Sequence, residues 1–186
     1  MDFEDLTILS WNIRGALSLE GRRHAKELVR KHHPLFIFLM EIHCPFSKTS
    51  IFWNRLGYEI CALSEASSHS GGIWVLKSKG CDYDITVIDA YFHAVTICIK
   101  KSDCMWFCSA IYGSPQLVNR EKLWSYLISI REDILSPWVM IGDFNEVIHP
   151  SEIKEGIFTA RQAEKLSNMM EQCNLIDLGA TCSIYT

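Results

Sequence analysis

Residues 140–147 read MIGDFNEV, and this stretch decides how the rest of the chain is interpreted. An apolar run from Trp138 to Ile141 ends at Gly142, and three oxygen-bearing side chains follow within the next four residues. Asp and Asn often begin turns, so one such residue after a strand indicates no more than a turn. The same arrangement at several strands would indicate a site.

The arrangement recurs three times earlier in the chain. Apolar, β-type runs lead directly into a polar side chain at Asn12 (after 6–11), Glu41 (after 35–40) and Tyr112 (after 105–111). An apolar strand gains little from leading into a carboxylate such as Glu41. The recurrence at several strands makes these residues candidates for a shared function.

Side chains alternate along a strand, and this alternation predicts that Asp143 and Asn145 face the same space while Phe144 turns into packing. The candidate set holds carboxylate, amide and phenol oxygens and no His or Cys. Such hard ligands suit Mg²⁺ or Mn²⁺. Because proteins hold Mg²⁺ through one or two carboxylates plus substrate phosphates, the set points to phosphoester chemistry.

The composition is that of one globular domain, which we predict over residues 1–186. The net charge of −4 excludes a polycation, so nucleic-acid contact requires a local basic patch or bound metal. No secretory signal and no membrane-spanning run is visible, so an intracellular location is expected. The eight scattered cysteines are then expected to be buried free thiols; a zinc site from Cys104, Cys108 and His93 has little support.

The apolar patterns predict a mixed α/β domain. Strands are expected at 6–12, 35–41, 58–63, 72–76, 84–88, 94–100, 105–113, 138–142 and from Leu175, and helices at 22–33, 46–56, 119–134 and 160–172. The closely spaced middle strands favour antiparallel hairpins. Two sheets with helices on their faces fit better than a plain doubly wound sheet, because no GxGxxG is present. Helix 46–56 is expected to bury Ile51, Phe52 and Leu56.

Four segments in order along the chain resemble the successive motifs of the endonuclease/exonuclease/phosphatase superfamily. They are SWNIRG (10–15), LMEIH (39–43), AIYGSP (110–115) and IGDFNEV (141–147), and GGIWVL (71–76) resembles the strand between the second and third. Within the superfamily, WNIRG, the Tyr-Gly-Ser-Pro segment and GDFNEV are most similar to the endonuclease domain of plant LINE-type, non-LTR retrotransposons.

The resemblance implies a four-layered α/β sandwich, with two mixed, largely antiparallel sheets flanked by helices and the site at one edge of the sheets. Glu41 matches the main metal carboxylate, and Asn12 matches a residue that helps to hold metal and phosphate. Tyr112 resembles the tyrosine that contacts the scissile phosphate. Asp143 matches the aspartate that orients or deprotonates the attacking water. Asn145 matches the asparagine that hydrogen-bonds the phosphate and steadies Asp143.

Several polar residues remain open in role. Arg14 stands where some superfamily members carry a carboxylate, and it is either a phosphate contact or a surface cation. The helix RRHAKELVRKHH (22–33) is either a patch for the DNA backbone or a solvated face. The histidines at positions 43, 69, 93 and 149 are expected to be surface or packing residues.

The family pattern continues beyond GDFN to an aromatic-Thr-Trp strand, a strand bearing another aspartate and a closing Ser-Asp-His. Tyr185-Thr186 matches only the start of the first of these, so the fold is expected to lack its last strands. The absence of Ser-Asp-His removes a central catalytic group, and we expect this chain to be weakly active or inactive. No spacing supports His149 as its substitute. A fragment of a longer polyprotein and a decayed copy both remain open.

The resemblance implies Mg²⁺-dependent phosphodiester hydrolysis of DNA. In a complete element, the nick would prime a reverse transcriptase domain of the same protein, which suggests a nuclear location. Two alternatives are a phosphatase acting on small phosphoesters and a catalytically dead domain that only binds metal, nucleic acid or a partner, or is a relic.

Overall fold

The computed structural model describes residues 6–14, 18–65, 71–91, 93–153 and 156–179. These residues form two compact units. The first unit holds the residues up to Tyr112 together with Ser136–Asp143. The second unit holds Gly113–Leu135 together with the residues from Phe144 onward.

One four-stranded sheet of the first unit has the order β1-β2-β4-β3. Its strands are β1 (Ile8–Asn12), β2 (Phe36–Ile42), β3 (Tyr58–Ser64) and β4 (Gly72–Ser78). Strands β1 and β2 are parallel because α1 (Leu19–His32) lies between them in the chain, and the other two pairings are antiparallel. Ser18 caps α1 by accepting a hydrogen bond from the backbone N–H of Gly21.

The second sheet of this unit has the order β5-β6-β7-β8. Its strands are β5 (Asp84–Tyr91), β6 (Ala94–Lys101), β7 (Cys104–Tyr112) and β8 (Trp138–Asp143). Strands β5, β6 and β7 form the predicted antiparallel meander, and β8 pairs with β7 in parallel. Both sheets are therefore mixed and largely antiparallel, as predicted.

The main core of the first unit lies between its two sheets. Alternate residues of β2, including Phe36, Phe38 and Met40, are almost fully buried in one cluster with Val95 and Ile97 of β6. The opposite face of β2 packs against the helices in a second cluster, which includes Ile37, Leu39, Ala25 of α1 and Trp53 of α2 (Ser50–Arg55). Each such fully buried side chain contributes about 1.5–3 kcal/mol to folding.

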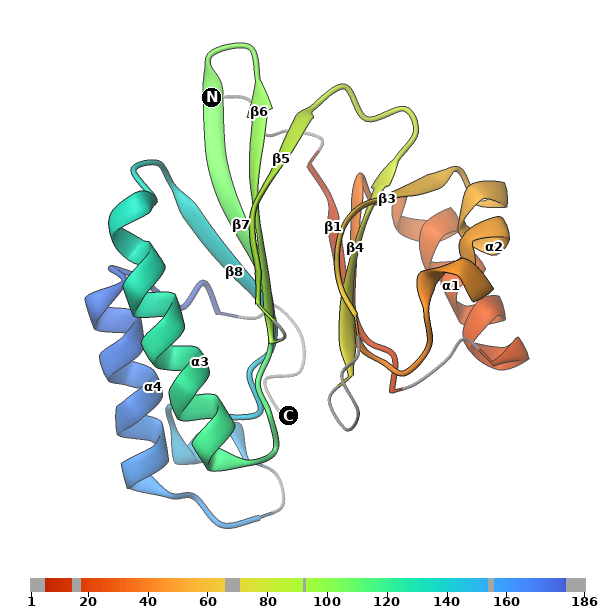
Figure 1. The fold of residues 1–186 in the computed structure, drawn as a ribbon. Coiled ribbons are helices and arrows are strands. Elements are labelled where there is room, and N and C mark those ends of the chain that lie inside the picture. The colour runs from red at the N-terminus through yellow and green to blue at the C-terminus, as the bar shows by residue number, and fades with distance from the viewer. Residues whose placement is uncertain (1–5, 15–17, 66–70, 92, 154–155, 180–186) are drawn as a thin grey trace. The chain divides into compact units, whose positions relative to one another are not determined.

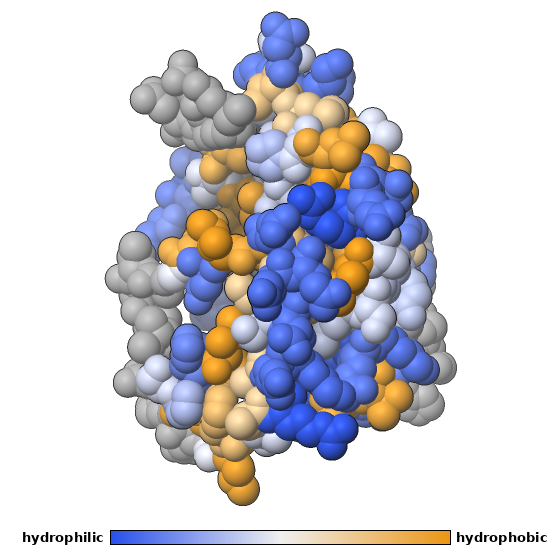
Figure 2. Space-filling view, turned by 90° about the vertical axis from the view of Figure 1, so that its left-hand side faces the viewer, coloured by the Kyte–Doolittle hydropathy of each residue, from blue (hydrophilic) through white to orange (hydrophobic). Residues whose placement is uncertain are grey.

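The second unit is built on α3 (Leu117–Ile130) and α4 (Ala160–Gln172), which lie side by side (Figure 1). Short 3₁₀ turns occur at Arg131–Asp133 and Pro150–Glu152. Helix α4 buries Ala163, Leu166 and Met169 at the spacing of one helical face. Its opposite side is polar, and Figure 2 shows a hydrophilic band on the surface of this helix pair.

Helix 160–172 has the predicted bounds, whereas helix 46–56 does not form as one piece. A 3₁₀ turn covers Phe46–Lys48, and α2 is only six residues long. The prediction that Ile51 is buried is wrong, because that side chain is 67% exposed and Trp53 is buried in its place. A helix this short has room for a narrow inner face, which the larger indole occupies.

The strand predicted from Leu175 is not present in residues 175–179, and residues 180–186 lie outside those described. Of the cysteines in the described residues, Cys108 and Cys173 are buried and the other five are half-buried, all as free thiols. Within the described ranges, none of the helices has the length and apolarity to span a membrane. The predicted fold class, an α/β sandwich with two mixed sheets, is confirmed.

Candidate active site at the strand ends

Asn12 and Asp143 are the last residues of β1 and β8, and they join the two sheets of the first unit. The amide Nδ2 of Asn12 donates a hydrogen bond to Oδ2 of Asp143 over 2.7 Å. The amide Oδ1 of Asn12 accepts one from the backbone N–H of Arg14 over 3.2 Å. Both ends of the amide are thus satisfied, which fixes its orientation and that of the carboxylate it contacts.

Glu41 lies in a β-bulge near the end of β2 and has a φ of +59°. The register against β4 shifts between Leu39 and Ile42. Because of this extra residue, Met40 joins the core between the sheets while Ile42 joins the core under the helices. Left-handed backbone at a residue other than Gly costs about 1–3 kcal/mol and is concentrated at functional sites.

Gly71 is the neighbour that makes room for this bulge. A Cβ at Gly71 would lie 2.4 Å from the Cα of Glu41, which no side chain tolerates. Gly142, just before Asp143, has a similar constraint, since its Cβ would lie 1.9 Å from the carbonyl oxygen of Ile111. Both glycines therefore permit close backbone contacts beside the candidate carboxylates.

Tyr112 connects the two carboxylates. It ends β7 opposite Asp143 in the parallel register, is 5% exposed, and its phenol is acted on by the negative charges of Glu41 and Asp143. Burial, the negative charges of Glu41 and Asp143 and the hydrogen bond to Glu41 raise the pKa of Tyr112 to about 12, and Arg14 opposes this rise. The phenol therefore keeps its proton at neutral pH and remains a hydrogen-bond donor.

His93 lies behind Tyr112. Its ring centroid is 6.0 Å from that of Tyr112, and its carbonyl oxygen accepts a hydrogen bond from the Tyr112 backbone N–H over 2.9 Å. His93 is 1% exposed, so the prediction that it is a packing residue is confirmed, and burial lowers the pKa of its ring. His43 and His149 are exposed, as expected of surface residues, and His69 lies outside the described residues.

Asn145 belongs to the second unit. Strand β8 ends at Asp143, and Asn145 has a φ of +48°, so the alternation argument used for this residue does not apply. Its amide Nδ2 donates to the carbonyl oxygen of Gly113 over 2.6 Å. The prediction that Phe144 packs is confirmed, because its ring stacks on Trp124 of α3 with centroids 6.0 Å apart.

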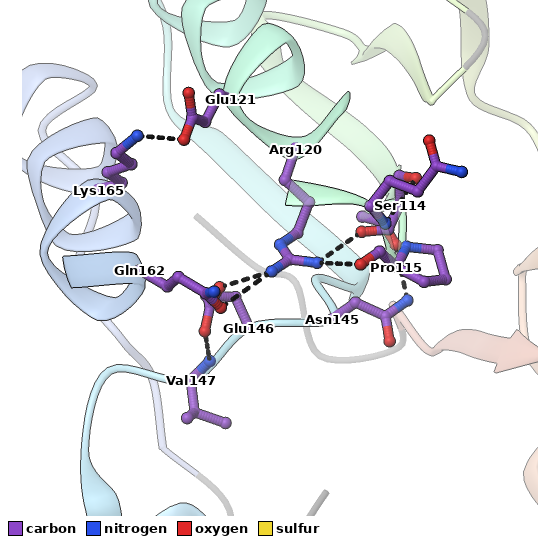
Figure 3. A network of polar contacts seen from close by, with 11 residues as sticks. Ser114, Pro115, Arg120, Glu121, Asn145, Glu146, Val147, Gln162 and Lys165 are labelled. Atoms are coloured by element: carbon purple, nitrogen blue, oxygen red, sulfur yellow. Dashed lines mark hydrogen bonds and ion pairs between the residues drawn. The ribbon is translucent and has the colours of Figure 1, made fainter. Parts of the chain in front are cut away.

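The second unit contains a buried polar network, centred on Arg120 of α3, that the sequence patterns did not predict (Figure 3). Its guanidinium is hydrogen-bonded to the carbonyl oxygens of Ser114 and Pro115, to Glu146 and to Gln162 of α4. The one indication of this network in the sequence was the charged residue Glu146, which directly follows GDFN (142–145). No local pattern identifies its partner, which lies 26 residues earlier in the chain.

The oxygen donors at these strand ends are few for a divalent cation. Across the described ranges, no group of three or more His, Cys, Asp and Glu side chains is placed to hold a metal ion. The first unit instead offers two carboxylates, Glu41 and Asp143, with the amide of Asn12 and the phenol of Tyr112. This sparse oxygen set fits Mg²⁺, which keeps several waters and takes further ligands from a substrate phosphate.

The structure thus brings together four of the five predicted site residues: Asn12, Glu41, Tyr112 and Asp143. A hydrogen bond ties Asn12 to Asp143, and the charges of Glu41 and Asp143 both act on Tyr112. The arrangement can bind a hard cation, orient a water and donate a hydrogen bond from the Tyr112 hydroxyl to an anion.

Comparison with solved structures gives the same fold in several nucleases and phosphatases. The endonuclease domain of TRAS1, a telomere-specific non-LTR retrotransposon, matches with a TM-score of 0.69 at 13% identity, over 94% of this chain and 75% of that one. An AP endonuclease from Archaeoglobus fulgidus matches with a TM-score of 0.65 at 14% identity, over 89% and 70% of the two chains.

A third match is the 3′ phosphatase NExo from Neisseria bound to a product DNA hairpin, with a TM-score of 0.63 at 14% identity, over 90% of this chain and 71% of that one. No protein-family model matches the sequence, and no curated protein matches it significantly. The structural neighbours are proteins of the endonuclease/exonuclease/phosphatase fold, and this chain shares that fold.

Proposed function

We propose that this chain carries the metal and water-activating half of a DNA phosphodiesterase site, of the kind found in retrotransposon endonucleases. The observation that carries the proposal is the convergence of Asn12, Glu41, Tyr112 and Asp143 from four strand ends in two sheets. The fold shared with nucleases and phosphatases supports hydrolysis of phosphoesters as the reaction class.

Glu41 and Asn12 are the residues that would hold Mg²⁺ or Mn²⁺. When bound, such an ion neutralises charge on a phosphate and lowers the barrier to attack by water. Asp143 accepts a hydrogen bond from Asn12 through Oδ2, which orients its carboxylate, and this carboxylate would orient a water and take its proton. The protonated phenol of Tyr112 holds Glu41 and can donate to a phosphate oxygen.

The substrate is proposed to be duplex DNA. Two solved neighbours, one a retrotransposon endonuclease domain and one bound to a DNA hairpin, support this choice. In a longer element-encoded protein, nicking by this domain would supply the 3′ end for a reverse transcriptase, in the nucleus. Genomic sequence downstream of Thr186 that reads into Ser-Asp-His and a reverse transcriptase supports this, and an unrelated reading frame there contradicts it.

The test measures how fast the purified chain nicks supercoiled plasmid in the presence of Mg²⁺. The same reaction with EDTA is the control. We expect slow, metal-dependent nicking at most, because no Ser-Asp-His follows Asp143 in these 186 residues. Fast nicking by the wild type that is abolished in Asp143→Ala would show that hydrolysis does not require the histidine of the Ser-Asp-His motif. Turnover of small phosphate esters without any effect on DNA would instead favour the phosphatase alternative.

A further inference from the structure

We propose that Arg120 is a positioning residue for the two loops that follow Tyr112 and Asp143 in the chain, residues 113–115 and 144–147, and that it acts through Asn145. The inference deepens the proposed function and rests on it, because the resemblance to the endonuclease/exonuclease/phosphatase superfamily implies that Asn145 hydrogen-bonds the substrate phosphate.

Arg120 bridges both loops with one side chain, which is 5% exposed (Figure 3). One terminal nitrogen, Nη1, donates to the carbonyl oxygens of Ser114 and Pro115 over 2.8 and 2.9 Å. The other, Nη2, donates to Oε2 of Glu146 over 3.0 Å and to Oε1 of Gln162 over 3.1 Å. The planar guanidinium thus sets the distance between the two loops.

A second link joins the same two loops one residue earlier on each. The Asn145 amide donates to the carbonyl oxygen of Gly113 over 2.6 Å. The backbones also touch there, since a Cβ at Gly113 would lie 1.9 Å from the carbonyl oxygen of Phe144. Backbone contact fixes the loops at Gly113, and Arg120 fixes them at Glu146. Asn145 lies between these two points and is held in a left-handed backbone conformation.

Lysine cannot replace Arg120 in this role. A guanidinium presents donors on two sides in a rigid fork, whereas an ammonium is a point charge on a flexible stem. Glu146 is equally constrained, because its side chain is 9% exposed and a buried carboxylate that loses its cation is left unpaired. Arg120→Lys therefore keeps the charge but should release one loop from the other.

Nuclear magnetic resonance of the Asn145 side-chain amide tests the positioning role directly. In the wild type, the Nδ2 proton that is hydrogen-bonded to Gly113 should have a chemical shift downfield of that of an amide without this bond. In Arg120→Lys, the chemical shift should move to the value of an amide without it. The backbone amide signals of α3 and α4 report whether the second unit of the variant is folded. Glu121→Gln is the matched control, because Glu121 of α3 also pairs with α4, through Lys165, but contacts neither loop. An unmoved Asn145 signal in folded Arg120→Lys overturns the inference.

Binding of a fluorescent DNA duplex in Ca²⁺ tests the link to function. Arg120→Lys and Asn145→Ala should each weaken binding about tenfold, the effect of losing one charge-assisted hydrogen bond, and the double variant should be no weaker than either. Losses that multiply in the double variant overturn the inference. If Arg120→Lys fails to fold, Glu146→Gln serves in both experiments. If the wild type binds no DNA, the proposed function fails, and the resonance experiment alone decides the role of Arg120.

Discussion

The 2.7 Å hydrogen bond from Nδ2 of Asn12 to Oδ2 of Asp143 joins the last residue of β1 to the last residue of β8. These strands belong to different sheets and lie 131 residues apart in the chain. The bond therefore exists only in the folded sandwich. It gives the Asp143 carboxylate a fixed orientation at the end of β8.

Gly71→Ala should damage the protein because its Cβ would enter the backbone of Glu41, 2.4 Å from Cα. We expect the free energy of unfolding to fall by about 2 kcal/mol or more, as for other overpacked sites, with loss of metal binding. Chemical denaturation and Mn²⁺ binding measure the two effects. Gly80→Ala is the control, since its Cβ would have only the Ser78 hydroxyl nearby, at 3.9 Å. Equal behaviour of the two variants would contradict this role for Gly71.

Tyr112 should make stability depend on pH in the alkaline range. Its pKa is about 12 in the folded protein, against 10.0 for an ordinary tyrosine. A group whose pKa rises on folding contributes stability below the unfolded pKa, and this contribution is lost as the pH rises from 10 to 12. Denaturation of wild type and Tyr112→Phe across this range should show a difference that shrinks with pH. Tyr83→Phe is the control. An effect of Tyr112→Phe on stability that does not change with pH would contradict this prediction.

Ser109 should anchor the strand that carries Asp143. Its buried hydroxyl shares a 2.7 Å hydrogen bond with Thr96 of β6 and accepts one over 2.9 Å from Nε1 of Trp138, the first residue of β8. Ser109→Ala leaves both groups without this partner, and we expect a loss of about 1–3 kcal/mol. Ser125→Ala, an exposed hydroxyl of α3, should cost far less. Thermal melting compares the stability of the two variants. If Ser109→Ala loses no more stability than Ser125→Ala, the Trp138 indole and Thr96 find other partners.

The strands were predictable because their signal is local. A run of apolar residues predicted a strand at 35–41, and the structure has β2 at 36–42. The meander of β5 to β7 follows from the short polar connections between these strands. The four site residues in the first unit were also found locally, each as a polar residue at or near the end of an apolar strand. The order of the motifs along the chain resembles that of the superfamily, and this resemblance suggested a role for each of these residues.

What the sequence left open depends on contacts between distant segments. The bulge at Glu41 requires Gly71, which lies 30 residues later, and the Arg120 network joins residues from 114 to 162. No periodicity encodes such pairs. The boundary of β8 was predicted within one residue, yet extending its alternation to Asn145 failed, because the chain takes up left-handed backbone there.

Binding of Mn²⁺, followed by the paramagnetic resonance signal of the free ion, tests the central claim most directly. The account predicts one saturable site in the wild type that is lost in Glu41→Gln. The site should persist in Glu59→Gln, which changes an exposed carboxylate paired with Lys77. Mn²⁺ binding that is as tight in Glu41→Gln as in the wild type would contradict the account, as would a wild-type protein that binds no ion at all.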